Sequence, residues 1–221
     1  MNALPLSLAG EPLLALASGA LYQPGQALLC VADLHLGKSD RIARRGGTLL
    51  PPFDTRATLD RLAAVIADTA PRTVLCLGDS FDDTAAAGSL APEDRDTLLS
   101  LQAGRHWVWA LGNHDPGPLD LGGTHLARLT AGPLTYRHIA APDHPPAGRA
   151  EVSAHYHPKL ALPGAGARPC FLFNDRRLIL PAFGTYTGGL RATDPVLRAL
   201  LGPRARAILT GRKPLLTALP T

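Results

Sequence analysis

The sequence contains few cysteines, few aromatic residues and no long apolar run. Three cysteines among 221 residues do not form a disulfide framework, and Cys30 and Cys76 lie in apolar runs, where a free thiol behaves as a small hydrophobic side chain. No run approaches the ~20 apolar residues that span a bilayer. Residues 1–20 lack a basic start and contain Pro5 and Pro12, so we expect neither a signal peptide nor a membrane partner. We expect a cytoplasmic location.

The remaining composition is typical of a globular protein. Hydrophobic residues make up 46% of the chain and charged residues 18%, while 22 glycines and 21 prolines indicate many turns. The length suits one well-buried domain over residues 1–221 and is short for two. The sequence contains no internal repeat and gives no indication of an oligomeric state.

An excess of arginine raises the pI to about 9.2. Basic residues gather at Arg41, Arg44 and Arg45, and the chain from Pro195 onward has five basic residues and no acid. Such a distribution is typical either of a solvated basic face or of a surface that contacts a phosphate polymer. Composition leaves both interpretations open.

The first half of the sequence alternates short apolar runs with an amphipathic pattern. Apolar residues recur with helical spacing from Leu59 to Ile66, behind a cap expected at Asp54 or Thr55. A helix between two buried strands is a βαβ unit, so these strands should be parallel and end at one edge of a sheet. The predicted strands are Ala27–Ala32, Thr73–Leu77 and Trp107–Leu111, with a second helix at Pro92–Gln102 and loops between His35 and Asp54, over Ser80–Ser89 and over Pro116–Gly132.

The second half of the sequence is rich in strand patterns. A small hairpin is expected at the other end of the chain, over residues 4–22, and a last helix should begin at Asp194. The predicted strands are Leu134–Arg137, Glu151–Ala154, Cys170–Phe173 and Leu178–Leu180. This order favours an α/β fold of two facing sheets with helices outside them.

Polar side chains follow four of these strands. Asp33 and His35 alternate with Leu34, so in an extended strand end both would point to one side, and His155 and His157 repeat this spacing. Oxygen and nitrogen ligands without a thiolate favour Mn, Fe or Zn, and two such ions lower the pKa of a bridging water and bind the oxygens of a phosphate ester. The four segments are Asp33-Leu34-His35, Gly78-Asp79, Gly112-Asn113-His114-Asp115 and His155-Tyr156-His157.

In this order the four segments resemble the calcineurin-like metallophosphoesterase superfamily. The resemblance implies a four-layer α/β/β/α sandwich and a dinuclear-metal phosphodiesterase, most often with manganese. It also implies roles for single residues: Asp33, His35 and His157 would bind one ion, Asp79 would bridge, Asn113 and His155 would bind the other ion, and His114 would stabilise the scissile phosphate and protonate the leaving oxygen.

A closer resemblance is to the ligase-associated DNA-damage-response phosphoesterases, the PdeM family. It implies a functional link to a DNA ligase, a helicase and a nuclease, and a DNA endonuclease activity in repair. Two residues depart from the family pattern: Ala154 stands where the family has glycine, and Asp82 stands where it has histidine, so that Asp82 is either an orienting group or a surface turn residue. The segments that carry the resemblance are Asp33–Lys38, Gly78–Phe81, His155–Pro158, Arg168–Cys170 and Leu180–Leu190.

The superfamily pattern implies one more histidine ligand between Asp115 and His155. His125 lies in a glycine-rich segment with no strand to orient it, and His144 is followed by two prolines. His138 follows a strand-like run and should emerge at a sheet end, as the other ligands do, so we favour it over His144.

Three functions remain open. The first is a phosphodiesterase that acts on nucleic acid, with Arg41, Arg44 and Arg45 in contact with the substrate. The second is a hydrolase of small nucleotides or other small phosphodiesters, because a metal site does not fix the leaving group. A groove lined with arginine would favour the first and a closed pocket the second. The third is a non-catalytic interaction subunit on the same fold.

Overall fold

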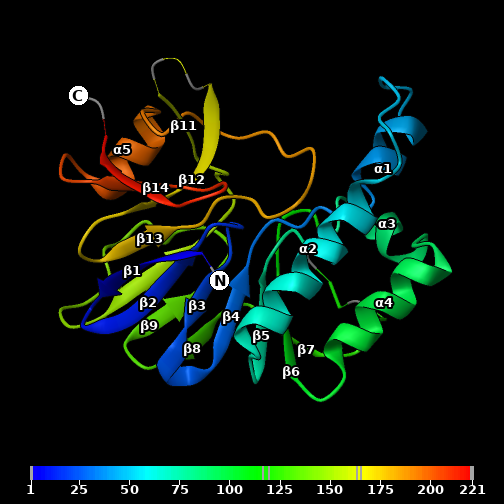
Figure 1. Ribbon diagram of the computed structural model, residues 1–221, viewed down its shortest axis with the longest axis horizontal. Coiled ribbons are helices and arrows are strands. Elements are labelled where there is room, and N and C mark those ends of the chain that lie inside the picture. Colours follow the sequence, from blue (N-terminus) through cyan, green and yellow to red (C-terminus); the bar gives the residue numbers. More distant parts are fainter. Residues whose placement is uncertain (1, 116, 119, 163, 165, 220–221) are drawn as a thin grey trace.

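Two mixed β-sheets with helices on their outer faces make up the computed structural model (Figure 1). The structure describes residues 2–115, 117–118, 120–162, 164 and 166–219. Residues 116 and 119, which belong to a predicted loop, lie outside the described residues, as do residues 1, 163, 165, 220 and 221. Among the described residues, none of the helices combines the length and apolar character that a membrane crossing requires.

The first sheet has seven strands in sequence order. The first four strands pair antiparallel, which extends the predicted hairpin by one strand, and the last four pair parallel, as the βαβ pattern predicts. A short 3-10 helix, Pro24–Gln26, precedes the fourth strand. The strands are β1 (Ala3–Leu8), β2 (Glu11–Leu16), β3 (Leu21–Gln23), β4 (Leu28–Val31), β5 (Thr73–Leu77), β6 (His106–Ala110) and β7 (Thr124–Leu126).

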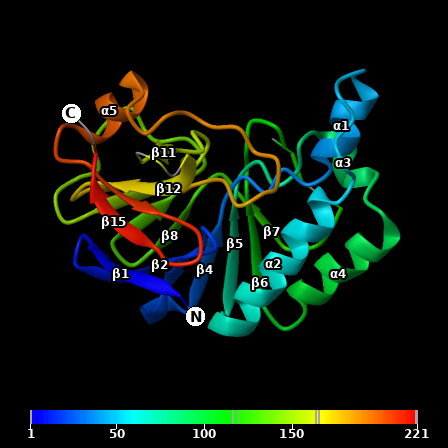
Figure 2. The ribbon, with the colours of Figure 1, turned by 45° about the horizontal axis from the view of Figure 1, so that its top comes forward.

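Helices cover the outer face of this sheet (Figures 1 and 2). The predicted apolar face of the longest helix is confirmed, because Leu59, Leu62 and Ile66 are buried against β5 and β6, although Ala63 is only half-buried. The helices on this face are α2 (Asp54–Thr69), α3 (Thr84–Gly88) and α4 (Pro92–Gln102), while α1 (Lys38–Arg44) projects beyond the sheet near the start of α2 (Figure 1).

The second sheet contains the strands of the second half of the chain. Its path is β15-β14-β12-β13-β10-β9-β8, with β11 paired to β12 at the side. Helix α5 (Pro195–Leu201) begins as predicted, with the Asp194 carboxylate accepting a hydrogen bond from the Val196 N–H, and it packs on this sheet. The strands are β8 (Leu129–Ala131), β9 (Leu134–Tyr136), β10 (Ala150–Ser153), β11 (Lys159–Ala161), β12 (Ala167–Phe173), β13 (Arg177–Ile179), β14 (Arg206–Leu209) and β15 (Leu215–Ala218).

A core of buried side chains lies between the two sheets. Leu75 and Val108 of the first sheet belong to one cluster with Val152 and Phe171 of the second. Together with the helix layers this arrangement confirms the predicted α/β/β/α sandwich. The layers matter for function because parallel strands present their carboxyl ends at one edge of the sandwich.

Several local predictions are wrong. The stretch Pro116–Gly132 is not only loop, since β7 and β8 lie in it, and the segments before Pro51 and before Ser89 contain α1 and α3. These elements are too short to show a clear periodicity. Strands β14 and β15 after the last helix were not expected. Asp54 and Thr55 do not cap α2, because their side chains accept hydrogen bonds from Ser39 and from the Gly37 N–H.

Candidate metal centre

The candidate ligands meet at the carboxyl ends of β4, β5, β6, β9 and β10. The segments that follow β4 and β5 stay hydrogen-bonded to each other. The N–H groups of Asp33 and His35 donate to the carbonyls of Gly78 and Asp79. From the second sheet, the N–H of His155 donates to Asp33 Oδ2 over 3.2 Å. Main-chain contacts therefore bring segments more than a hundred residues apart to one place.

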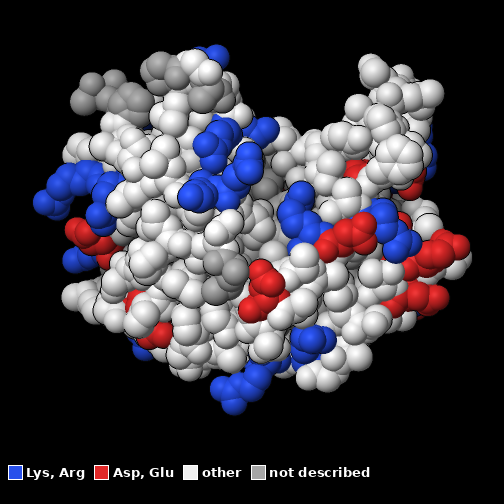
Figure 3. All heavy atoms as spheres, viewed as in Figure 1, with Lys and Arg blue, Asp and Glu red and all other residues white. Residues whose placement is uncertain are grey.

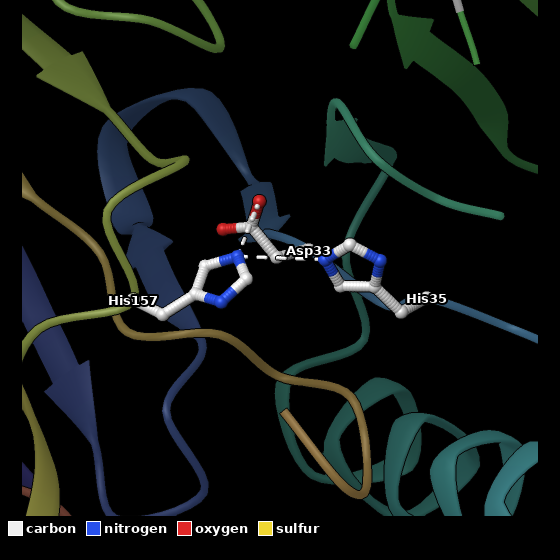
Figure 4. A group of neighbouring side chains, drawn as sticks. All are labelled: Asp33, His35 and His157. Carbon is white, nitrogen blue, oxygen red and sulfur yellow. Dashed lines mark hydrogen bonds and ion pairs between the residues drawn. The ribbon is translucent and has the colours of Figure 1, made fainter. Parts of the chain in front are cut away.

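The first group consists of Asp33, His35 and His157 (Figure 4). The two imidazoles point toward each other with 3.5 Å between their Nε2 atoms, and Asp33 Oδ1 lies 3.1 Å from Nε2 of His157. Asp33 Oδ1 is buried and has no hydrogen-bond partner among the described residues. Three potential ligand atoms thus face one point, as a cation site requires.

The second group consists of Asp79, His138 and His155, with Asn113 beside it. Nδ1 of His138 lies 3.0 Å from the carbonyl oxygen of Leu77, and a carbonyl only accepts, so Nδ1 carries the proton. Nε2 of His138 lies 3.0 Å from Asn113 Oδ1 and 3.3 Å from Asp79 Oδ2. In the neutral imidazole this nitrogen holds a lone pair, so three acceptor atoms converge where a cation would fit.

Five of the candidate ligands adopt a left-handed backbone conformation. Among the described residues, Asp33, His35, Asp79, His155 and His157 have φ between 44° and 72°. The expectation of an extended strand end at Asp33–His35 and at His155–His157 is therefore wrong, although both side chains of each pair still enter the site. A non-glycine residue in this region costs about 1–3 kcal/mol and persists only where the surroundings hold it, which is common at functional sites.

Two glycines leave room for the ligands. A Cβ on Gly112 would lie 2.2 Å from Asp79 Oδ1 and from the Asp79 nitrogen. A Cβ on Gly78, whose φ is 79°, would lie 2.4 Å from the ring of His138. Any larger side chain at these two positions would push a ligand out of place.

His114 lies beside both groups without belonging to either of the two ligand sets predicted for metal. Its main-chain N–H donates to Asp79 Oδ1 over 2.8 Å, and its Nδ1 lies 2.8 Å from the carbonyl oxygen of Asp82. Nδ1 therefore carries a proton, and Nε2, 4.0 Å from Asp79 Oδ2, faces the site. The side chain is 30% exposed, so a substrate can reach it.

Asp82 is buried beside His35, so it is not a surface turn residue, and its orienting role stays a prediction. Its side chain is fully buried, and Oδ1 lies 2.8 Å from Nδ1 of His35. Lys38 and Arg41 pair with the same carboxylate at 3.2 Å and 2.8 Å. Because Nδ1 of His35 contacts Asp82, the other ring nitrogen, Nε2, is the one that faces His157 and the first group.

The remaining acid of the segment that contains His114 is Asp115, which sequence reasoning left without a role. Its Oδ2 accepts hydrogen bonds from the N–H groups of Ser80 and Phe81. It thereby holds the segment that follows Asp79. The position of Asp115 beside Asn113 and His114 was the available signal, but its partners depend on the fold.

The arginines predicted to contact substrate lie mostly in ion pairs. Arg41 pairs with Asp82, and Arg44 donates to both oxygens of Asp83 at 2.9 Å. Arg45, at the end of α1, is exposed. Among the described residues, Arg45 is the member of this set that has no carboxylate partner. Substrate contact by the three arginines stays a prediction.

Electrostatics favour an ionised Asp79. Burial opposes its charge, but the neighbouring His138 and the N–H of His114 lower its pKa to about 2. Burial likewise opposes a charged His138, yet Asp79 and Asp33 raise the pKa of this imidazole. Burial raises the pKa of Asp115 to about 6. Burial and the neighbouring His138 lower the pKa of His155, which keeps this imidazole neutral and able to bind a cation.

The other two candidate histidines lie elsewhere. His144 is exposed and lines a hollow with Asn174 and Arg176. His125 lies in β7, so the expectation that no strand orients it is wrong, and it does not belong to either group of ligands. Ala154 is buried between the sheets and its φ is not positive, so its methyl group is accommodated.

Comparison with known proteins agrees with this geometry. The family model of the calcineurin-like phosphoesterases matches residues 27–167. The chain belongs to this family. The match includes every candidate ligand, and the family assignment makes the protein a metal-dependent phosphoesterase. No curated protein matches the chain.

Two solved structures are similar to this member of the family. A nuclease from Pseudomonas putida, MPE, is 28% identical with a TM-score of 0.75, and the match covers 97% of this chain and all of that one. Yfce, a phosphoesterase from E. coli, is 14% identical with a TM-score of 0.44, over 87% of this chain and 99% of that one.

Proposed function

We propose that this phosphoesterase is a phosphodiesterase with two metal ions that cleaves a polynucleotide. The observation that carries the metal centre is the convergence of two groups of ligand atoms, Asp33, His35 and His157 on one side and Asp79, His138 and His155 on the other. The potential ligand atoms within each group lie within 4.8 Å of one another. Such distances suit one divalent ion in each group.

The residues fit two divalent ions. Asp33, His35 and His157 would hold one, and Asn113, His138 and His155 the other, with Asp79 between them as the bridging ligand. Because no thiolate belongs to the set, manganese is the metal that we propose, with iron or zinc as the other candidates. When bound, such ions would activate water for attack on phosphorus and offset the charge of the phosphate oxygens.

His114 would act on the substrate directly. Its Nδ1 proton is held by the carbonyl of Asp82, and its Nε2 faces the open side of the site. In the doubly protonated form, Nε2 would donate a hydrogen bond to a phosphate oxygen and then a proton to the leaving oxygen. Asp79 would hold this histidine in place through the N–H of His114.

A polynucleotide substrate rests on two observations. The similar P. putida protein is a nuclease, and the similarity extends over the whole of both chains. One of the segments that resemble the PdeM family, Leu180–Leu190, contacts the site, since its Gly184 donates its N–H to the carbonyl of Asp33. This narrower resemblance supports a role in DNA repair, linked to a ligase, a helicase and a nuclease. The three buried free thiols support a location in the reducing cytoplasm.

A substrate comparison tests this proposal. Manganese-loaded protein is assayed with bis(para-nitrophenyl) phosphate, with small cyclic nucleotides and with DNA and RNA oligonucleotides, and the Asp79→Asn variant controls for contaminating nucleases. We expect turnover of the aryl ester and of an oligonucleotide, both lost in the variant. Turnover of small diesters alone would support a small-molecule hydrolase. No turnover of any substrate by metal-loaded protein would support an interaction subunit.

A further inference from the structure

A basic hollow lies away from α1, on the side of the second sheet. Arg168, Arg212 and Lys213 line it together with Asn2 and Gly211, and its volume is about 720 Å³. Arg168 belongs to β12, while Arg212 and Lys213 form the turn between β14 and β15. Figure 3 shows Lys and Arg side chains gathered over these elements, in the upper middle of the face, with no Asp or Glu among them.

The charges of this hollow are not offset. Between Arg176 and the end of the chain there are eight basic residues and one acid, Asp194. Among the described residues, Arg212 and Lys213 form no ion pair, and Arg168 donates to the carbonyl of Thr210 instead of to a carboxylate. Arg41 and Arg44, by contrast, have Asp82 and Asp83 as partners. Three uncompensated cations around one hollow favour an anionic occupant.

A second hollow lies beside the first and is lined by part of the segment that contacts Asp33. The second hollow, of about 260 Å³, shares Gly211 with the first and is also lined by Arg61 and by Ala182–Gly184. These last residues belong to a segment, residues 181–191, that we call the strap. The strap leaves the end of β13, reaches toward α2 and returns to α5 in Figures 1 and 2.

Contacts hold the strap between α2 and the metal centre. Arg61 of α2 donates to the carbonyl of Phe183 and stacks on its ring at 4.6 Å, and Thr58 lies 3.1 Å from Thr185. On its other side, the N–H of Gly184 donates to the carbonyl of Asp33 over 3.1 Å. The strap, which lines the second hollow, is therefore joined to a candidate metal ligand by one main-chain hydrogen bond.

From these observations we infer that Arg168, Arg212 and Lys213 bind the phosphates of a polynucleotide strand whose scissile bond lies at the metal centre. This inference rests on the proposed function and names the surface that serves it. A phosphodiester backbone carries one negative charge per nucleotide, so it is complementary to the three cations that line this hollow. A small diester bound at the metal centre would not extend to this hollow.

The test is the salt dependence of oligonucleotide binding. The affinity of a fluorescently labelled DNA oligonucleotide is measured without divalent ions, so that no hydrolysis occurs, for the Arg212→Ala/Lys213→Ala double variant. The matched control is Arg176→Ala/Arg204→Ala, which removes two exposed arginines around a different hollow that also contains Asp175. Thermal melting checks that both variants are folded.

Each phosphate contact contributes about 0.7–0.9 to the slope of log affinity against log salt. The double variant should therefore lose roughly 1.4–1.8 from this slope, because it removes two contacts. Its ratio of oligonucleotide turnover to aryl-ester turnover should fall, while the control keeps the wild-type slope. An unchanged slope, or an equal loss in the control, would overturn the inference. Failure of the wild type to hydrolyse the aryl ester would instead contradict the proposed function, because binding is measured without catalysis.

Discussion

The carboxylate of Asp82 lies 2.8 Å from Nδ1 of His35 in the interior of the protein. This contact leaves Nε2 of the imidazole directed at His157. The same carboxylate pairs with Lys38 and Arg41, and the hydrogen bond with His35 and these two cations lower the pKa of Asp82, although burial opposes its ionisation. Asp82 thus favours the charged form, as we expect of a group that orients a metal ligand.

Replacing Asp82 by asparagine should weaken one metal site. A partner that orients a ligating histidine contributes roughly 10–100-fold in metal affinity, so Asp82→Asn should lower manganese affinity by that order. The measurement is a manganese titration by calorimetry. Asp83→Asn is the matched control, because it removes the adjacent charge while asparagine still caps α3. Equal affinities of Asp82→Asn and wild type would contradict the orienting role.

His138 and His144 should differ in the same titration. His138→Ala should bind one manganese tightly and the other weakly, because the variant lacks an imidazole between Asp79 and Asn113. Its turnover should recover in part at high manganese concentration. His144→Ala should behave as the wild type, since that side chain is exposed in another hollow. If His144→Ala lost an ion and His138→Ala did not, His144 would be the metal ligand.

His114 should affect turnover and not metal content. A positioned acid–base group contributes ~10²–10⁴ in rate, so His114→Ala should slow hydrolysis by that order with both ions retained. The loss should be smaller for esters whose leaving group needs no proton. Steady-state rates on two aryl diesters of different leaving-group pKa, together with metal analysis, measure this. If His114→Ala lost a metal ion, His114 would be a metal ligand and not an acid–base group.

Asp79 should be needed for both metal and turnover. Its pKa of about 2 keeps it charged near neutral pH, and asparagine removes that charge with little change in shape. Asp79→Asn should lose at least one ion and nearly all hydrolysis while its melting transition remains cooperative. Elemental analysis measures the ions, an aryl-ester assay measures hydrolysis, and circular dichroism follows the melting transition. A variant with two ions and wild-type turnover would show that Asp79 is not the bridge.

The strands that carry the site could be predicted well from the sequence. The local backbone geometry at the ends of these strands could not. The run Thr73–Leu77 forms β5 over those residues, and the rule that ligands follow strands placed His138 beside Asp79. The rule failed to predict the left-handed conformation of Asp33 and His35, because the contacts that hold it come from distant segments.

The roles of charged residues could be predicted least. Arg41 and Arg44 were expected to meet a substrate, and in the structure they meet Asp82 and Asp83, which lie in a separate segment. The helix α1 that carries them was not expected either. Pairing of charges depends on which loops lie together, and the periodicity of a sequence holds no information about that.

The metal content of the wild-type protein is the most direct test of the dinuclear centre. Protein loaded with manganese and then dialysed is measured by elemental analysis, with His138→Ala and Asp79→Asn treated in parallel. Two ions per wild-type chain, and fewer in both variants, are the predicted result. One ion or none in the wild type, or equal content in all three proteins, would contradict a dinuclear centre built from these ligands.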